Sequence, residues 1–228
     1  MAIISSKESD VNSYIAFFDL DRTITSAVSG NVLARSAYKK GLMSHSEMIN
    51  ALWLLLAYKL SVRDPVKIIN EMAGWVKGVP EKIFDNLSTE ISQNVLLPSV
   101  YPAAKREIQM HNENKARTVI LSSAPASVCR EMVKSLGMDD MVCSHLEVVD
   151  GYLTGRSLGP LCFGQEKVTR MREYCELNNS TPENSWFYGD SIADFPALSI
   201  AGYPVCINPD KKLLKNARTN GWRIYLWD

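Results

Sequence analysis

The stretch Tyr14-Ile-Ala-Phe-Phe-Asp-Leu-Asp21 carries the strongest structural signal in this chain of 228 residues. Aromatic and aliphatic side chains fill it up to Asp19, which predicts a strand buried on both faces, as in a parallel sheet. Similar short apolar runs recur at residues 117–122, 185–188, 203–207 and 222–226. Segments of helical character lie between or beside them, at residues 102–112, 126–136, 166–177 and 210–219. Alternating strands and helices predict a three-layer α/β fold with a doubly wound parallel sheet.

Residues 29–97 interrupt this alternation. They contain no clear strand, and their pattern predicts helices at residues 29–40, 45–60, 64–77 and 80–95. We therefore expect a core formed by residues 1–28 and 98–228, with a helical domain of residues 29–97 inserted between the first and second strands. Within the core, residues 145–154 alternate around Asp150-Gly151, which is typical of a hairpin with a two-residue turn.

The charge balance argues against several classes of partner. Lys plus Arg and Asp plus Glu both number 25, so the formal net charge is zero. Nucleic acids and anionic membrane surfaces attract an excess of positive charge, and we expect neither as a partner. The longest strongly apolar run, residues 51–58, is far shorter than the roughly 18 residues of a membrane-spanning helix.

The cysteines and the N-terminal residues bear on the compartment. The five cysteines are an odd number, are widely spread and form no C-x-x-C pair, which argues against a disulfide framework or a zinc site. The first residues contain no hydrophobic region of the kind found in signal peptides. We therefore predict a cytoplasmic protein.

Two acidic pairs follow predicted strands. Asp19 and Asp21 come directly after the first strand, and Asp190 and Asp194 follow the strand at 185–188. Carboxylates are costly in an apolar core, and ligands of α/β sheets bind in the crevice at the carboxyl ends of the strands. A solvated turn or a helix N-cap is the alternative for each pair. Together, the two pairs predict an oxygen-rich site suited to Mg²⁺.

Three further residues belong to this pattern. Ser122 and Ser123 end the strand at 117–122 just before a helix, where a hydroxyl and backbone N–H groups form an anion site. A simple N-cap is the alternative for these serines. Lys167 begins a predicted helix, a position at which most lysines are solvated, so it gains meaning only beside the acidic pairs.

The ordered combination of an acidic pair, a serine, a lysine and a second acidic pair resembles the haloacid dehalogenase superfamily. The helical insert resembles the cap of its phosphoserine-phosphatase-like branch, subfamily IB. The resembling motifs are Asp19/Asp21/Thr23, Ser122, Lys167 and Asp190/Asp194. The resemblance implies a Rossmann-like core and a phosphatase that transfers a phosphoryl group to an aspartate with the help of Mg²⁺.

The resemblance also implies roles for these residues. Asp19 is expected to be the nucleophile and Asp21 the general acid and base. The expected phosphate-binding residues are Thr23, which also fixes the nucleophile loop, Ser122, Ser123 and Lys167. The expected Mg²⁺ site consists of the Asp19 and Asp190 carboxylates, the Asp21 backbone carbonyl, and Asp194, which orients the metal's waters or Lys167.

Departures from the phosphoserine phosphatases bear on the substrate. Val28 occupies the position of their substrate-binding acidic residue, and Met72 lies near the position of their arginine, which Arg63 could replace only with a different geometry. Ala193 and Arg22 replace a usual asparagine and serine. A small phosphorylated metabolite other than phosphoserine is therefore expected.

The predicted cap also contains apolar residues that either pack its helices or line a substrate pocket. They are Trp53, Leu54, Leu55, Leu56, Tyr58, Met72 and Trp75. A pocket would suit a bulkier leaving group. The alternatives to a small-metabolite phosphatase are a phosphatase of a lipid head-group phosphate, resembling the phosphatidylglycerophosphate enzymes, a non-catalytic phosphate-binding regulatory protein, and an enzyme that transfers phosphate to an acceptor other than water.

Overall fold

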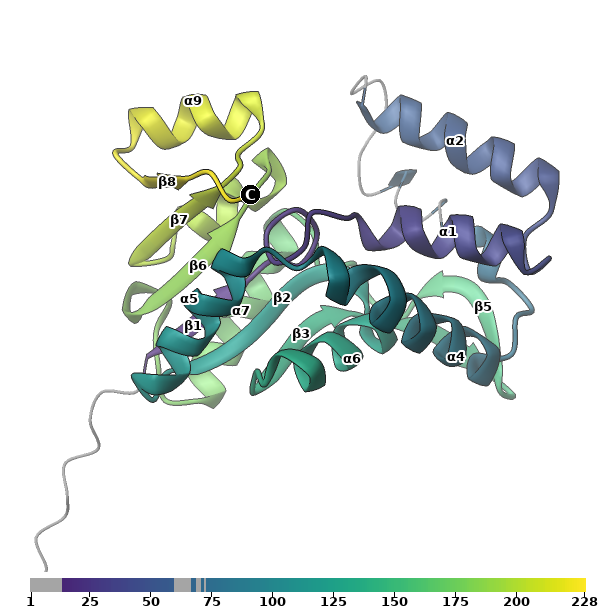
Figure 1. The fold of residues 1–228 in the computed structure, drawn as a ribbon, viewed down its shortest axis with the longest axis horizontal. Helices are drawn as coiled ribbons and strands as arrows, with labels where there is room; N and C mark the ends of the chain where they lie inside the picture. The colour runs from purple at the N-terminus through teal and green to yellow at the C-terminus, as the bar shows by residue number, and fades with distance from the viewer. Residues whose placement is uncertain (1–13, 60–66, 69–70, 72) are drawn as a thin grey trace, which may run out of the picture.

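The computed structural model describes residues 14–59, 67–68, 71 and 73–228 (Figure 1). Its centre is a six-stranded sheet in the order β3-β2-β1-β6-β7-β8, and every neighbouring pair is parallel. The strands are β1 (Ile15–Phe18), β2 (Arg117–Pro125), β3 (Asp140–Ser144), β6 (Ser185–Gly189), β7 (Tyr203–Ile207) and β8 (Arg223–Tyr225). The predicted parallel α/β sheet is confirmed.

The central strand β1 explains why the first apolar stretch decides the fold. All four of its residues are buried, and alternate side chains enter different clusters on the two faces of the sheet. Phe18 stacks on Tyr188 of β6 with ring centroids 4.3 Å apart, whereas Phe17 packs with the cluster on the opposite face. A strand with apolar residues on both sides therefore organises both layers at once.

Helices cover both faces of the sheet, so the three-layer prediction is confirmed. Helices α5 (Pro102–Glu113) and α6 (Ala126–Leu136) pack on the face that contains Phe18. Helices α7 (Gln165–Leu177), α8 (Phe195–Leu198) and α9 (Lys211–Thr219) pack on the face that contains Phe17.

Strand β1 ends at Phe18, and Asp19 and Asp21 lie in the turn directly after it, as predicted. Strand β2 differs from the prediction, because it continues beyond Ser122 to Pro125. Strand β3 was not predicted, because it is an edge strand whose first three residues are only half-buried and whose apolar run is short.

Residues 29–97, the helical insert, contain α1 (Ser29–Lys39), α2 (His45–Lys59) and α4 (Glu81–Ile91), which continues into the π-helical turn Ser92–Leu96. These agree with the helices predicted at 29–40, 45–60 and 80–95. The helix predicted at 64–77 lies largely outside the described residues, and its last described part is a single 3-10 turn, Gly74–Val76. Helices α1 and α2 run next to each other at one side of the sheet (Figure 1).

A small antiparallel hairpin extends from the main sheet. It consists of β4 (Leu146–Val149) and β5 (Tyr152–Ser157). The two turn residues, Asp150 and Gly151, have φ angles of 51° and 80°, the left-handed values that such a turn requires. The predicted hairpin is confirmed.

The cysteines and helices add two further findings. All five cysteines are buried free thiols. Among the helices of the described part of the chain, none combines the length and the apolar character needed to cross a membrane.

Candidate active site

The register of the parallel sheet gathers the predicted site at one edge. Phe18 of β1 pairs with Ile120 of β2 and with Tyr188 of β6. The residues that follow these positions therefore leave the sheet at the same edge, its carboxyl end. The backbone N–H of Asp19 donates to the carbonyl of Tyr188 at 2.9 Å, which ties the start of the first acidic turn to the neighbouring strand.

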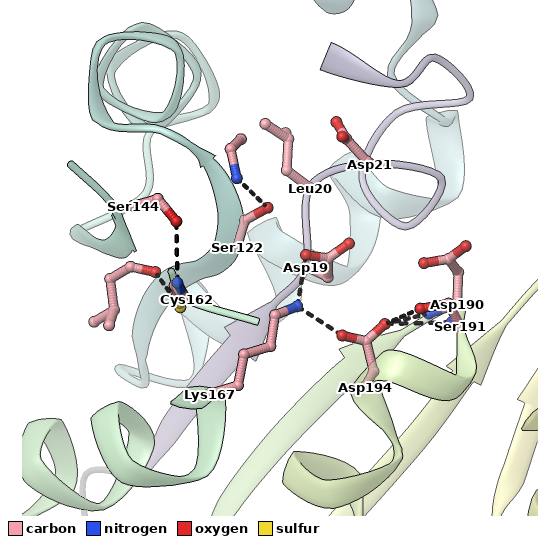
Figure 2. A network of polar contacts seen from close by, with 12 residues as sticks. Asp19, Leu20, Asp21, Ser122, Ser144, Cys162, Lys167, Asp190, Ser191 and Asp194 are labelled. Atoms are coloured by element: carbon pink, nitrogen blue, oxygen red, sulfur yellow. Dashed lines mark hydrogen bonds and ion pairs between the residues drawn. The ribbon is translucent and has the colours of Figure 1, made fainter. Parts of the chain in front are cut away.

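Lys167 joins the two acidic pairs. Its Nζ lies 2.8 Å from Oδ1 of Asp19 and 2.6 Å from Oδ1 of Asp194, and all three side chains are buried (Figure 2). Burial alone would lower the pKa of the Lys167 ammonium, but the attraction of Asp19 and Asp194 outweighs burial and raises it. Lys167 is thus a permanently charged group within the carboxylate cluster.

Asp194 shapes the turn that follows β6. Its Oδ2 accepts hydrogen bonds from the backbone N–H groups of Asp190 and Ser191, at 3.2 and 3.3 Å, and from the Ser191 hydroxyl. Because its Oδ1 is bound to Lys167, both oxygens of Asp194 have protein partners. A Cβ at Gly189 would lie 2.8 Å from the Cβ of Asp194, so this turn requires glycine there.

Asp21 points toward the helical insert. Its Oδ1 accepts the backbone N–H of Ser29 at 2.8 Å, and its Oδ2 accepts the Ser29 hydroxyl at 2.9 Å. Figure 2 shows its carboxylate directed away from Lys167. Burial and the nearby charge of Asp19 raise the pKa of Asp21 to about 7, although the Ser29 hydrogen bonds oppose this rise. At neutral pH the group can therefore both donate and accept a proton.

The donor set fits a divalent cation. Carboxylate oxygens of Asp19, Asp190 and Asp194 lie within 4.8 Å of one another. Burial, followed by repulsion from Asp194 and Asp19, raises the pKa of Asp190 to about 9. Burial also raises the pKa of Asp19, which Lys167 only partly offsets. Oxygen ligands with surplus negative charge suit Mg²⁺. Since Asp194 already has protein partners on both oxygens, Asp19 and Asp190 are the better ligands.

The predicted phosphate-binding residues differ in position. Ser122 is buried within β2, where its hydroxyl opposes the rise in the pKa of Asp19 and accepts the N–H of Ala124 at 3.4 Å. Ser123 lines the cavity described below. Thr23 is fully buried, does not line that cavity, and its hydroxyl has no hydrogen-bond partner among the described residues. The structure therefore does not bring Thr23 to the place where a phosphate would bind.

A cavity of about 380 Å³ opens above the cluster. Its charged floor comprises Asp19, Asp21, Arg22, Lys167, Asp190 and Asp194. Much of its wall is apolar and comes from both the helical insert and the core, with Val28, Leu33, Trp75, Phe84, Leu161 and Phe163 among the lining residues. The cavity thus combines an ionic end with an apolar end.

The sequence-based list of apolar cap residues agrees with the cavity in part. Trp75 lines it, but Leu54 packs in the interior and Trp53 is 56% exposed. Trp53 therefore neither lines this cavity nor packs in the interior. Arg63 and Met72, like the side chains of residues 55–59, lie outside the described residues.

Sequence reasoning missed Ser29 and the cavity residues Leu161 and Phe163. Ser29 lies eight residues after Asp21, and only its place at the start of a predicted helix could have pointed to it as a carboxylate partner.

Comparisons with known proteins agree with this architecture. A probable phosphatase from Mycobacterium tuberculosis is 26% identical over 216 residues, which cover 92% of this chain and 74% of that protein. A histidinol-phosphatase from Neisseria meningitidis is 24% identical over 216 residues, covering 92% and 97%. A solved protein of unknown function from Bordetella pertussis has a TM-score of 0.85 at 22% identity, covering 94% of this chain and 98% of that chain.

The sequence model of the haloacid dehalogenase-like hydrolases matches residues 16–199, which include both acidic pairs, Ser122 and Lys167. The chain therefore belongs to the haloacid dehalogenase-like hydrolases.

Proposed function

We propose that this hydrolase is a Mg²⁺-dependent phosphatase that acts on a small phosphomonoester other than phosphoserine through a phosphoryl group carried by Asp19. One observation carries the proposal: the buried Lys167 ammonium bridges Asp19 and Asp194 on the floor of a cavity that Asp190 also lines. The phosphatase names of two relatives support the same reaction class.

In the first step, a carboxylate oxygen of Asp19 forms a bond to phosphorus while the bond from phosphorus to the leaving oxygen breaks. Lys167, Ser122 and the Ser123 backbone N–H are the groups near Asp19 that can bind the transferring oxygens. Donors fixed in a buried site stabilise the developing negative charge because they need no rearrangement.

Asp21 supplies the proton that the leaving oxygen needs and then removes a proton from the water that hydrolyses the Asp19 acyl phosphate. A pKa of about 7 suits both directions of transfer. Ser29 holds the carboxylate by both oxygens, which fixes its orientation between these two steps.

Asp19 and Asp190, together with the Asp21 backbone carbonyl, would hold Mg²⁺, which neutralises the repulsion between the anionic nucleophile and the anionic substrate. Asp194 supports this arrangement indirectly, because it binds Lys167 and the backbone of Asp190 and Ser191.

The cavity supports an apolar leaving group over phosphoserine. Val28 and Ala193, at positions where phosphoserine phosphatases have polar partners, both line the cavity, as does Trp75. An amino acid head group needs charged or hydrogen-bonding partners, which these side chains do not provide. We also propose that residues 29–97 act as the cap of a core formed by residues 1–28 and 98–228.

A phosphate-release screen tests the proposal. The protein is incubated with a panel of phosphomonoesters that includes phosphoserine and aryl phosphates, with Mg²⁺ or with EDTA, and free phosphate is measured. We expect release that EDTA abolishes and added Mg²⁺ restores, with aryl phosphates ahead of phosphoserine. Binding of phosphate esters without turnover would instead indicate a regulatory protein, and equal turnover in EDTA would contradict the metal site.

A further inference from the structure

The β4–β5 hairpin is bonded to the helical insert as well as to the core. The N–H of Gly78 donates to the carbonyl of Leu153 at 2.8 Å, and the N–H of Leu153 donates to the carbonyl of Val79 at 2.9 Å. The N–H of Glu81 donates to the carbonyl of Gly151 at 3.0 Å. These backbone bonds add residues 78–81 to β5 as a short third strand-like segment, although the two segments lie about seventy residues apart in sequence.

Apolar side chains close the same junction. Leu153 of β5 is 3% exposed and belongs to one cluster with Val76, which is 2% exposed, and Val79. Each of these residues comes from a segment too short to bury an apolar side chain by itself. The hairpin and residues 74–81 therefore stabilise each other's position.

Gly155 brings the two backbones into close contact. A Cβ built at Gly155 would lie 3.0 Å from the Cβ of Lys77 and 3.2 Å from the carbonyl oxygen of Gly74. Gly155 also has a φ of 80°, a left-handed conformation that favours glycine. Any larger side chain at this position must push residues 74–77 away from β5.

This junction lies directly behind the apolar wall of the cavity. Trp75 lines the cavity, the turn Gly74–Val76 that contains it packs against β5, and Gly74 and Lys77 lie next to Gly155. On the core side, Leu146 of β4 lines the same cavity. The hairpin and residues 74–81 together therefore contribute cavity-lining residues from both the helical insert and the core.

We propose that the β4–β5 hairpin is a positioning element for the leaving-group end of the cavity, which it sets by holding residues 74–81 and therefore Trp75 in place. The proposal rests on the proposed phosphatase function. It makes Gly155 a positioning residue that determines which leaving groups fit, although it lies outside the Asp19–Lys167 cluster.

A matched pair of glycine variants tests the proposal. Gly155→Ala introduces the contact with residues 74–77, whereas Gly159→Ala places a Cβ at a similar φ of 76° with no atom within 4 Å. The pair separates the contact from the backbone strain. We expect hydrogen exchange of peptides spanning residues 74–81 to quicken by roughly threefold or more in Gly155→Ala only. We expect KM for 1-naphthyl phosphate to rise about fivefold in this variant, with KM for acetyl phosphate and kcat for both within about twofold.

A third variant tests whether the hairpin acts on the leaving group through Trp75. Trp75→Ala should raise KM for 1-naphthyl phosphate as Gly155→Ala does, without quickening exchange at residues 151–155. Equal effects of the two glycine variants, or unchanged exchange and KM in Gly155→Ala, would overturn the proposal. If the unmodified protein hydrolyses neither compound, the proposed function fails, and the positioning role is then decided by the exchange result alone.

Discussion

Two polar networks meet strand β6, and they differ in how closely they crowd acidic groups together. The first is the cluster of Asp19, Lys167, Asp190 and Asp194 at the carboxyl end of the sheet. The second links Tyr14, His111, Tyr188 and Glu107. Nδ1 of His111 accepts from the Tyr14 hydroxyl at 2.9 Å, Nε2 lies 2.8 Å from the Tyr188 hydroxyl, and Tyr188 donates to Glu107 at 2.8 Å.

In the second network, both ring nitrogens of His111 and both tyrosine hydroxyls have hydrogen-bond partners within the fold. A neutral His111 with its proton on Nε2 donates to Tyr188 and accepts from Tyr14, so every ring nitrogen has a partner. Burial lowers the pKa of His111 to about 4, which keeps it neutral. The first network places three acidic side chains around one ammonium, and burial and mutual repulsion raise the pKa of Asp19 and of Asp190. Such crowding of buried acidic groups indicates a binding site, whereas hydrogen bonds that the fold completes by itself indicate a structural role.

Removing the nucleophile should produce the largest effect. Asp19→Asn deletes the attacking oxygen's charge and is expected to lower kcat by at least about 10³-fold, because no other group can form the covalent bond. Asp85→Asn, on helix α4 and not among the residues that line the cavity, is the control and should retain activity. Steady-state phosphate release checks this, and near-normal turnover by Asp19→Asn would refute the nucleophile assignment.

Removing the second proposed metal ligand should come next. In Asp190→Asn a carboxyl group whose pKa of about 9 keeps it protonated until a cation binds becomes an amide that cannot ionise. We expect about 10²-fold lower turnover at limiting Mg²⁺, and a smaller rise of the melting temperature on Mg²⁺ addition than in the unmodified protein, because the cation binds the folded state more weakly. Thermal melts with and without Mg²⁺ measure this. An unchanged Mg²⁺ response would exclude Asp190 as a ligand.

The acidic residues and Lys167 of the first network could be predicted from sequence, whereas the contact between Ser29 and Asp21 could not. Asp19 and Asp190 each follow a strong apolar run, and the parallel sheet brings such positions to one edge. Ser29 carries only the weak signal of its place at the start of a predicted helix, because its contact with Asp21 depends on how α1 leaves the nucleophile turn. The link between the hairpin and residues 78–81 likewise joins distant segments through backbone atoms, which side-chain patterns do not encode.

A more modest effect is expected at Ser29. Ser29→Ala removes one of two hydrogen bonds to Asp21, and a hydrogen bond to a charged group contributes about 1.5 kcal/mol at the low end of its range, so turnover of alkyl phosphates should fall about tenfold. The rate at which p-nitrophenyl phosphate phosphorylates Asp19, measured as the burst of p-nitrophenolate, should change little, since its leaving group needs no proton from Asp21. Ser29→Thr should restore activity, and the exposed Ser26→Ala is the control. Equal losses in the phosphorylation rate for both substrate classes would argue against the positioning role.

The second network, around His111, should affect stability rather than turnover. Because the pKa of His111 is lower in the fold than its ordinary 6.5, unfolding takes up a proton as the pH falls below that value. The stability that His111 contributes is therefore present above pH 6.5 and is lost toward pH 4. Between pH 7 and pH 5 the unmodified protein should lose roughly 2 kcal/mol more than His111→Gln. Urea unfolding at both pH values measures this difference, and parallel losses would contradict it.

The proposed role of the first network, the acidic cluster around Lys167, is tested most directly by trapping the phosphoryl group on Asp19. The protein is mixed with an aryl phosphate and Mg²⁺, quenched in acid within milliseconds, digested and examined by mass spectrometry. We predict a phosphoryl group on the peptide that contains Asp19, lost on treatment with hydroxylamine and absent from Asp19→Asn. Steady release of phosphate by the unmodified protein with no phosphorylated Asp19 at any quench time would contradict the account.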